Sequence, residues 1–222
     1  MKQLVLDIGP DADPTFENFV ASGNEALIDA LLGAIRGASH LYLWGPRGCG
    51  RTHLLKAAVT TARAAGRAAE LHAGESIDTL PATNGLLLCI DDVDALDEPA
   101  QIALFNAFNR AAHARQTLLL SGETAPLGLA LREDLRTRIG QCLVFEVQPL
   151  DDESRSAILR QIARRRGLEL ADELIGFLLR HGSRELPRLI SVVEALDRAS
   201  LEHKRPVTLP LLRELIQLGL EI

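Results

Sequence analysis

A glycine-rich loop between an apolar run and a helix-like segment constrains the fold of this chain more than any other feature. The apolar run Leu41–Trp44 predicts a buried strand, and the residues from Thr52 to Thr61 have the composition of a helix. The loop between them reads GPRGCGR. A strand, a glycine-rich loop and a helix in this order indicate a phosphate cradle, because backbone N–H groups and the helix N-terminus then point at the anion.

The loop matches the pattern G-x-x-x-x-G-K-[ST] at every defined position except one. Gly45 and Gly50 fit, and the Thr52 hydroxyl can reach a Mg²⁺ ion held by the phosphates. Arg51 replaces the lysine, and a guanidinium grips phosphate oxygens but is bulkier than an ammonium. We therefore expect binding of ADP or ATP with Mg²⁺ and little or no hydrolysis by the chain itself. The expected contacts are Gly45, Pro46, Arg47, Gly48, Cys49, Gly50, Arg51, Thr52 and His53.

A second signature of a nucleotide site follows further along the chain. The apolar run that begins at Leu86 ends abruptly in Asp91 and Asp92. In a doubly wound sheet, ligands bind where the carboxyl ends of the strands meet, so a central strand would deliver both acids there. We assign Asp91 to the Mg²⁺ shell and Asp92 to the place of a water-activating carboxylate. Alone, the pair would also fit an acidic turn, but after a glycine-rich loop the nucleotide interpretation is favoured.

Strand-like and helix-like segments alternate through the first two thirds of the chain. Further strands are expected at Ala68–Ala73, Thr117–Leu120 and Leu143–Val147. With the two runs above they predict an α/β fold, a five-stranded parallel sheet between helices. From Pro149 onward the pattern is helical only, which predicts a small all-helical domain. We expect an N-terminal peptide and linker at 1–14, an α/β domain at 15–148 and the helical domain at 149–222.

Composition excludes several classes of protein. Of the 222 residues 47% are apolar and 24% charged, which is enough for a full core. No segment has the pattern of a signal peptide or approaches ~20 uninterrupted apolar residues, so we expect a cytoplasmic protein that does not interact with membranes. The net charge is −6 and no basic tract is present, which argues against direct, tight binding of nucleic acid.

The N-terminal residues allow two interpretations. Residues 1–8 read MKQLVLDI and are separated from the rest by Gly9 and Pro10. They fit an edge strand or a frayed terminus. They also resemble the Q-L-x-L-x-[LF] peptide that bacterial proteins insert into the pocket of the replication sliding clamp. In that interpretation the clamp-binding residues are Gln3, Leu4, Leu6 and Ile8.

Three more segments carry a family resemblance when they are taken in order. The segment that begins at Thr15 reads TFENF, the one that begins at Leu135 reads LRTRI, and the one that begins at Ser183 reads SREL. Each segment also has an interpretation that involves no function. TFENF would supply aromatic residues to the core, LRTRI would be a solvent-exposed charged helix, and SREL would be an exposed helix start. Together with the loop and the two acids, they resemble the DnaA family of AAA+ proteins in order and spacing across almost the whole chain.

The resemblance implies roles for particular residues. Phe16, Asn18 and Phe19 would flank the adenine base, and Arg184 would reach from the helical lid to the phosphates. Arg138 would be an arginine finger that acts in trans in a neighbour's nucleotide site, with Arg136 facing elsewhere. The resemblance to regulatory members of the family, which carry a clamp-binding peptide before the AAA+ fold, implies that we should expect no DNA-binding domain like that of DnaA.

The resemblance also implies a function. The protein would bind ADP, dock on the DNA-loaded sliding clamp, the beta subunit of DNA polymerase III, and stimulate hydrolysis of ATP bound to DnaA, which prevents re-initiation of replication. Contact with DNA would be only indirect, and formation of a homodimer stays open. Two alternatives remain, a stand-alone AAA+ ATPase such as a helicase loader and a pure interaction adaptor.

Overall fold

The computed structural model describes residues 13–222 with the exception of 38, 75–76, 78 and 184. The chain divides into an α/β unit, Asp13–Pro149, and a helical unit that includes Leu150–Ile222. Each unit is described by itself below. Within the described part of the chain, no helix has the length and apolar character needed to cross a membrane.

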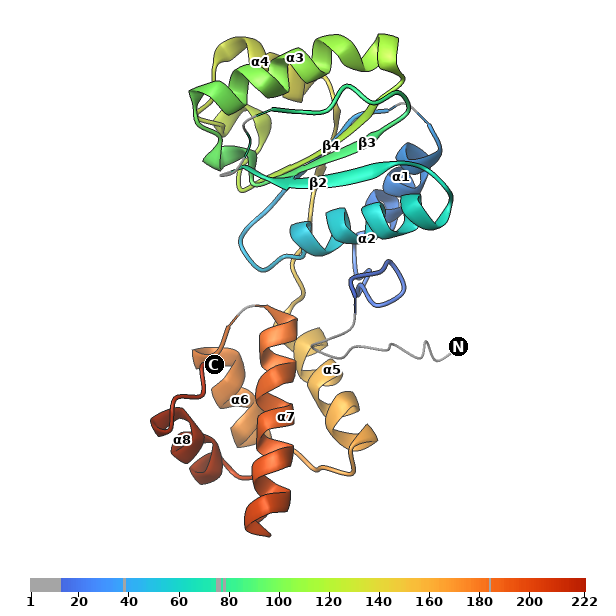
Figure 1. The fold of residues 1–222 in the computed structure, drawn as a ribbon. Coiled ribbons are helices and arrows are strands. Elements are labelled where there is room, and N and C mark those ends of the chain that lie inside the picture. Colours follow the sequence, from blue (N-terminus) through green and yellow to red (C-terminus); the bar gives the residue numbers. More distant parts are fainter. Residues whose placement is uncertain (1–12, 38, 75–76, 78, 184) are drawn as a thin grey trace. The chain divides into compact units, whose positions relative to one another are not determined.

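The α/β unit is built on one parallel sheet of five strands (Figure 1). The strands are β1 (Leu41–Trp44), β2 (Ala69–Ala73), β3 (Leu87–Asp91), β4 (Thr117–Gly122) and β5 (Leu143–Glu146). Their order is β2-β3-β4-β1-β5, and every pair of neighbours is parallel. Strands β3 and β4 are buried along their whole length, which explains their continuous apolar runs. The predicted fold class is therefore confirmed.

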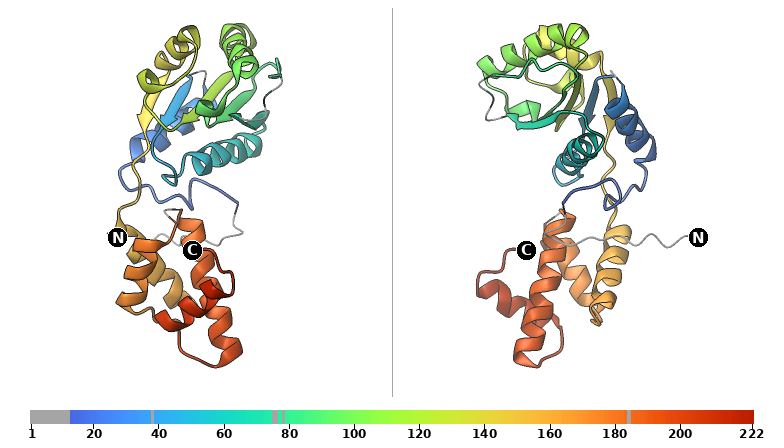
Figure 2. Two further views of the ribbon diagram at one scale, coloured as in Figure 1. Left: turned by 90° about the vertical axis from the view of Figure 1, so that its left-hand side faces the viewer. Right: turned by 45° about the vertical axis from the view of Figure 1, so that its right-hand side comes forward.

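Helices cover both faces of the sheet, as the views in Figures 1 and 2 agree. Helices α1 (Glu25–Arg36) and α2 (Arg51–Ala64) lie on one face, and their apolar residues share a core with Leu41, Leu43 and Leu119. Helices α3 (Glu98–Ala114) and α4 (Glu133–Gly140) lie on the other, where they enclose a second core. Short 3₁₀ turns at Val93–Ala95 and Pro126–Gly128 complete this unit.

Arg67 ties three distant parts of the α/β unit together. Its guanidinium donates to the carbonyl oxygens of Ala34 (3.0 Å) and Ile35 (2.6 Å) at the end of α1. It also donates to the Gly85 carbonyl (2.8 Å) before β3 and to the Thr117 hydroxyl (2.8 Å) in β4. The bonds to Ala34 and Ile35 lie at the C-terminus of α1, where carbonyls have few partners within the helix, so one side chain links the end of α1 to the segment before β3 and to the start of β4.

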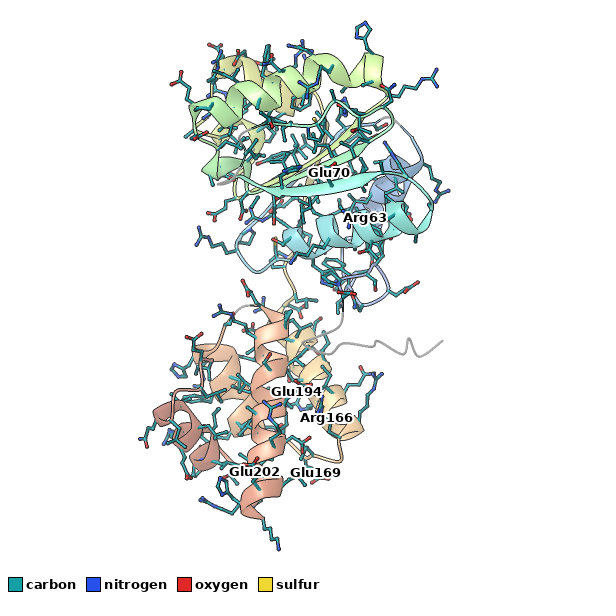
Figure 3. The ribbon with its side chains drawn as sticks, in the orientation of Figure 1. Arg63, Glu70, Arg166, Glu169, Glu194 and Glu202 are labelled. Carbon is teal, nitrogen blue, oxygen red and sulfur yellow. The ribbon has the colours of Figure 1, made fainter. Side chains whose placement is uncertain are left out.

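The helical unit contains α5 (Asp152–Arg165), α6 (Asp172–His181), α7 (Leu186–His203) and α8 (Leu209–Gln217). Helices α5 and α8 are capped at their N-termini, because Asp151 accepts from the Ser154 N–H and Thr208 from the Leu211 N–H. Figure 3 shows Arg166, which follows α5, directed at Glu194 of α7. Arg166 pairs there with Glu194, and with Asp197 at 3.6 Å, which links the two helices at a half-buried position.

The predicted elements differ from the observed ones only near their ends. Helix α2 begins at Arg51, earlier than predicted, and β4 extends to Gly122. The periodicity of apolar residues predicts that a helix or strand is present but not the residue at which it ends, because capping residues and neighbouring strands determine the end.

Candidate functional site

The glycine-rich loop joins β1 to α2, and two of its glycines are required by their surroundings. Gly50 has φ +103°, and a Cβ on it would lie 2.6 Å from Cε2 of Phe19. A Cβ on Gly45 would lie 2.9 Å from the Val147 carbonyl oxygen and 3.0 Å from the Cys49 sulfur. The left-handed backbone and these close approaches exclude larger residues. The loop is thus held in a tight turn immediately before the N-terminus of α2, the geometry that suits an anion.

A segment from the start of the α/β unit lies against this loop. The Phe19 ring touches Gly50 and packs against the His53 ring, with centroids 5.5 Å apart. Nε2 of His53 lies 2.9 Å from the Thr15 carbonyl oxygen. The segment TFENF is therefore fastened to the first turn of α2, next to the candidate phosphate cradle.

Asn18 has a local role in this segment. Its Oδ1 accepts a hydrogen bond from the Thr15 N–H (2.8 Å), and its own N–H donates to the Thr15 hydroxyl (3.2 Å). Its Nδ2 donates to the Asp13 carbonyl (3.0 Å). Since these bonds engage both ends of the amide, Asn18 acts in this structure as the brace of a turn.

Arg51 is the buried cation of the site. It is only 7% exposed, and its Nη2 lies 3.1 Å from Oδ1 of Asp92. Its Nη1 is buried without a hydrogen-bond partner among the described residues. A buried, unsatisfied N–H of a cation is costly, and a phosphate oxygen would satisfy it. The first turn of α2 therefore fits an anionic ligand.

The two acids lie at the carboxyl end of β3, as their place after the apolar run predicts. Asp91 is buried and accepts a hydrogen bond from the Ser121 hydroxyl of β4. Asp92 has a left-handed backbone (φ 52°), and its N–H donates to the same hydroxyl (3.0 Å). Burial raises the pKa of Asp92 above its ordinary value; the Asp91 carboxylate adds to the rise and Arg51 opposes it.

The end of β4 also lies beside the glycine-rich loop. Its register places Gly122 beside Trp44, so β4 ends level with the start of the loop. Glu123 follows, where Nε of Arg47 from the loop lies 2.5 Å from its Oε1 and lowers the pKa of Glu123. The Glu123 N–H donates to Asp94 (2.7 Å). The loop is thus tied to the ends of both β3 and β4.

The structure brings several of the predicted residues together and leaves others elsewhere. Phe19 and His53 contact each other beside the loop, and Arg51, Asp92 and Asp91 form a second set of contacts that runs through the Ser121 hydroxyl. Phe16 packs against the core beneath α1 and α2. Cys49 is buried, which raises its thiol pKa, and the Thr52 side chain is exposed in the first turn of α2. Gln3, Leu4, Leu6, Ile8 and Arg184 lie outside the residues that the structure describes.

Arg138 contacts α3, away from the loop. It is exposed on α4, its Nη2 donates to Oδ1 of Asn109 (3.2 Å), and its guanidinium carbon lies 6.0 Å from the centre of the Phe105 ring. Arg136 of the same helix is half-buried. The two arginines therefore have different surroundings, as their spacing on a helix predicts.

The family resemblance implies a polar residue that senses the γ-phosphate region in the segment Ser121–Glu123, and the structure adds the contact of Ser121 with Asp91. Asp94, which accepts a hydrogen bond from the Glu123 N–H, is a polar residue that the sequence pattern did not predict. The signal for Asp94 was its position two residues after Asp92, within the turn that follows β3. The signal for Ser121 was a lone hydroxyl at the end of an otherwise apolar strand.

Known structures share this fold. Domain III of the replication initiation protein DnaA from Thermotoga maritima is 24% identical, with a TM-score of 0.72, and the match covers 94% of this chain and 97% of that one. A replication initiator DnaA bound to AMPPCP and single-stranded DNA is 24% identical, with a TM-score of 0.67 over 86% and 67% of the two chains. The Holliday junction branch migration motor RuvB of Thermotoga maritima is 18% identical, with a TM-score of 0.65 over 92% and 72%.

The parallel sheet, its loop and the helical unit that follows have the fold of AAA+ proteins such as DnaA. Within the helical unit, residues 152–216 match the family model described as Hda, lid domain. The match covers the helical unit, which is therefore similar to the lid domain of Hda proteins.

Proposed function

We propose that the protein is a nucleotide-binding regulator of replication initiation that stimulates hydrolysis of ATP bound to DnaA while docked on the DNA-loaded sliding clamp. DnaA would thereby be converted to its ADP form, and re-initiation would be prevented. The similarity of residues 152–216 to the Hda lid domain supports the choice of DnaA as the partner.

The observation that carries the proposal is the exposure of Arg138 and the kind of partners that it contacts. Its side chain is exposed, and no carboxylate of the described residues forms an ion pair with it. An arginine that enters a partner's nucleotide site has to be accessible and has to keep its charge, because it stabilises negative charge that develops on the transferred phosphoryl group.

The chain's own site supports binding of a nucleotide more than its turnover. The loop, the N-terminus of α2 and the unsatisfied Nη1 of Arg51 fit phosphate oxygens, and Thr52 and Asp91 are the residues that would hold Mg²⁺. A bound Mg²⁺ would neutralise phosphate charge. Arg51 holds Asp92, however, so the carboxylate placed to orient a water is already engaged by a cation. We assign ADP as the nucleotide that this arrangement favours.

Clamp docking completes the proposal. Gln3 would bind polar groups at the mouth of a pocket on the clamp, and Leu4, Leu6 and Ile8 would fill its apolar floor. The support for this step is the sequence pattern. Contact with DNA would then be indirect, through the clamp, which agrees with the acidic net charge.

The experiment that tests the proposal is phosphate release from DnaA loaded with radiolabelled ATP. Release is measured with the chain and clamp-loaded DNA together, and with each omitted. We expect strong stimulation only when both are present. Equal release with and without the chain would refute the proposed function.

A stand-alone AAA+ ATPase, such as a helicase loader, is the second candidate. The observation that favours it is the set of Thr52, Asp91 and Asp92 at one site, which an active enzyme would use. Rapid hydrolysis of free ATP by the purified chain would support this candidate. An adaptor with a non-functional nucleotide fold would instead bind neither ADP nor ATP in calorimetry.

A further inference from the structure

Phe105 and Asn109 of α3 contact Arg138 from neighbouring turns of one helix. The two residues are four positions apart, so they lie on the same face of α3. Asn109 receives a hydrogen bond from one guanidinium nitrogen of Arg138, and the Phe105 ring lies beneath the guanidinium. Both contacts come from a helix, and helices hold side chains more precisely than loops do.

Helices α3 and α4 form a firm base for this contact. Leu104 and Ala107 of α3 and Leu135 and Ile139 of α4 are buried in the same core, on the side of the sheet opposite α1 and α2. Arg138 therefore projects from a helix that the core holds in place. The residues that its side chain contacts belong to α3, which packs in the same core.

The partners of Arg138 differ in charge from those of two other exposed arginines of the α/β unit, Arg47 and Arg132. Arg47 pairs with Glu123, and Arg132 pairs with Asp134 at 3.0 Å. Arg138, in contrast, has an amide oxygen and an aromatic ring as its partners among the described residues. A carboxylate would neutralise the guanidinium, whereas an amide and a ring orient it and leave its positive charge intact.

We propose that Asn109 and Phe105 are positioning residues, which hold the guanidinium of Arg138 at the surface in a fixed direction without neutralising it. This inference deepens the proposed function and rests on it. Asn109 occupies one donor nitrogen, and the remaining N–H groups of the fork stay available for phosphoryl oxygens of a partner's nucleotide. An arginine that is already oriented loses less side-chain freedom when it enters that site.

The test uses the full-length chain with Asn109→Ala, and Asn106→Ala as the matched control. Asn106 is also exposed on α3, and with Asn109 it lines a hollow of the surface. Among the described residues, no hydrogen bond joins Asn106 to Arg138. Hydrolysis of DnaA-bound ATP is measured over a range of chain concentrations on clamp-loaded DNA. For Asn109→Ala we expect a maximal rate roughly tenfold lower, with an unchanged half-saturating concentration, because orientation of a catalytic group affects the chemical step. Asn106→Ala should match the wild type.

Two further variants separate positioning from simple structural support. In an Arg138→Ala background, Asn109→Ala should cause no additional loss, since its effect acts through Arg138. Asn109→Asp has the same shape but introduces a carboxylate, and it should be at least as slow as Asn109→Ala. Wild-type rates for Asn109→Ala or for Asn109→Asp, or an additive loss in the double variant, would overturn the inference.

A measurement without DnaA keeps this inference distinct from the proposed function. In ¹⁵N NMR of the isolated chain, the Arg138 Nε–H signal should report an ordered side chain in the wild type and in Asn106→Ala, and a mobile one in Asn109→Ala. Equal mobility in all three would refute the positioning role. Absence of any stimulation by the wild-type chain would instead refute the proposed function, whatever the NMR result.

Discussion

Nη2 of Arg51 lies 3.1 Å from Oδ1 of Asp92, so the residue that replaces the lysine of the phosphate-loop pattern is paired with the acid that directly follows β3. The pair joins a cation that is 7% exposed to a carboxylate that is 52% exposed. Burial and Asp91 raise the pKa of Asp92, and Arg51 opposes this rise, so the pair makes this half-exposed carboxylate a weaker acceptor of a proton from water than it would be without Arg51. We therefore predict that this site binds a nucleotide but hydrolyses it slowly.

Replacing Arg51 by lysine should increase turnover. The wild-type chain is expected to bind ADP more tightly than ATP and to hydrolyse ATP very slowly, because the guanidinium fits poorly between the β- and γ-phosphates. In Arg51→Lys, a compact ammonium would contact these phosphates and release Asp92. We expect intrinsic hydrolysis to rise about tenfold or more and the preference for ADP to shrink. Phosphate release and calorimetry with both nucleotides measure these changes.

The control for this prediction is Asp92→Asn in the Arg51→Lys background. If the gain in turnover depends on the freed carboxylate, this second change should remove it. A gain that persists in the double variant would show that Asp92 is not responsible. Fast hydrolysis by the wild-type chain would show that the Arg51–Asp92 pair does not suppress turnover.

Stability of the α/β unit should fall as the pH falls below about 6.5, the ordinary pKa of histidine. Burial lowers the pKa of His53, only partly opposed by its contact with the Thr15 carbonyl, and burial also lowers that of His40. Below the ordinary pKa the unfolded chain binds more protons than the folded chain, so acid favours unfolding. The His53→Gln variant, whose amide can still donate to Thr15, should lose less stability between pH 7.5 and 5.5 than the wild type.

The measurement is urea unfolding followed by fluorescence of Trp44, the only tryptophan of the chain and a residue of β1. This signal reports the α/β unit separately from the helical unit. His113→Gln is the matched control, because His113 is exposed on α3 and its loss should leave the pH dependence unchanged. Parallel pH profiles for the wild type and His53→Gln would contradict the prediction.

Local sequence patterns predicted most of this structure, and the features that they missed are those that depend on contacts between distant segments. The five strands and the loop follow from apolar runs and glycine spacing, which act over a few residues. The contact of Arg51 with Asp92 depends on the order of the strands, which no single segment determines. The contact of Arg138 with α3 depends on how two helices pack. The contacts of Asn18 with Thr15 show the local hydrogen bonding that asparagine favours in turns, and its place beside the base stays a prediction.

The N-terminal peptide should be separable from the fold. Replacing Gln3 and Leu4 together by alanine is expected to abolish retention on an immobilised sliding clamp, with a loss of roughly several kcal/mol, because few residues dominate such short interfaces. Asp7→Ala is the matched control, since that position is variable in the clamp-binding pattern. Both variants should unfold at the same urea concentration as the wild type. Undiminished retention of the double variant would exclude docking through this peptide.

The last prediction distinguishes the two arginines of α4. Arg136 and Arg138 are two residues apart, so their side chains point roughly 200° apart and only one can face a given partner. Arg138 is exposed and rests on α3, whereas Arg136 is half-buried. A guanidinium in a partner's nucleotide site can meet two phosphoryl oxygens at once, which stabilises the charge of the transition state more than that of the bound ATP.

Arg138→Ala should therefore bind ADP and the clamp as the wild type does but stimulate hydrolysis of DnaA-bound ATP ~10³-fold less or worse, since a trans arginine contributes on this scale. Arg136→Ala, the matched control on the same helix, should retain most of the stimulation. Phosphate release from DnaA on clamp-loaded DNA measures both. If only Arg136→Ala loses stimulation, Arg136 is the catalytic arginine; if neither variant does, hydrolysis is stimulated without an arginine from α4, and the exposed charge of Arg138 requires another explanation.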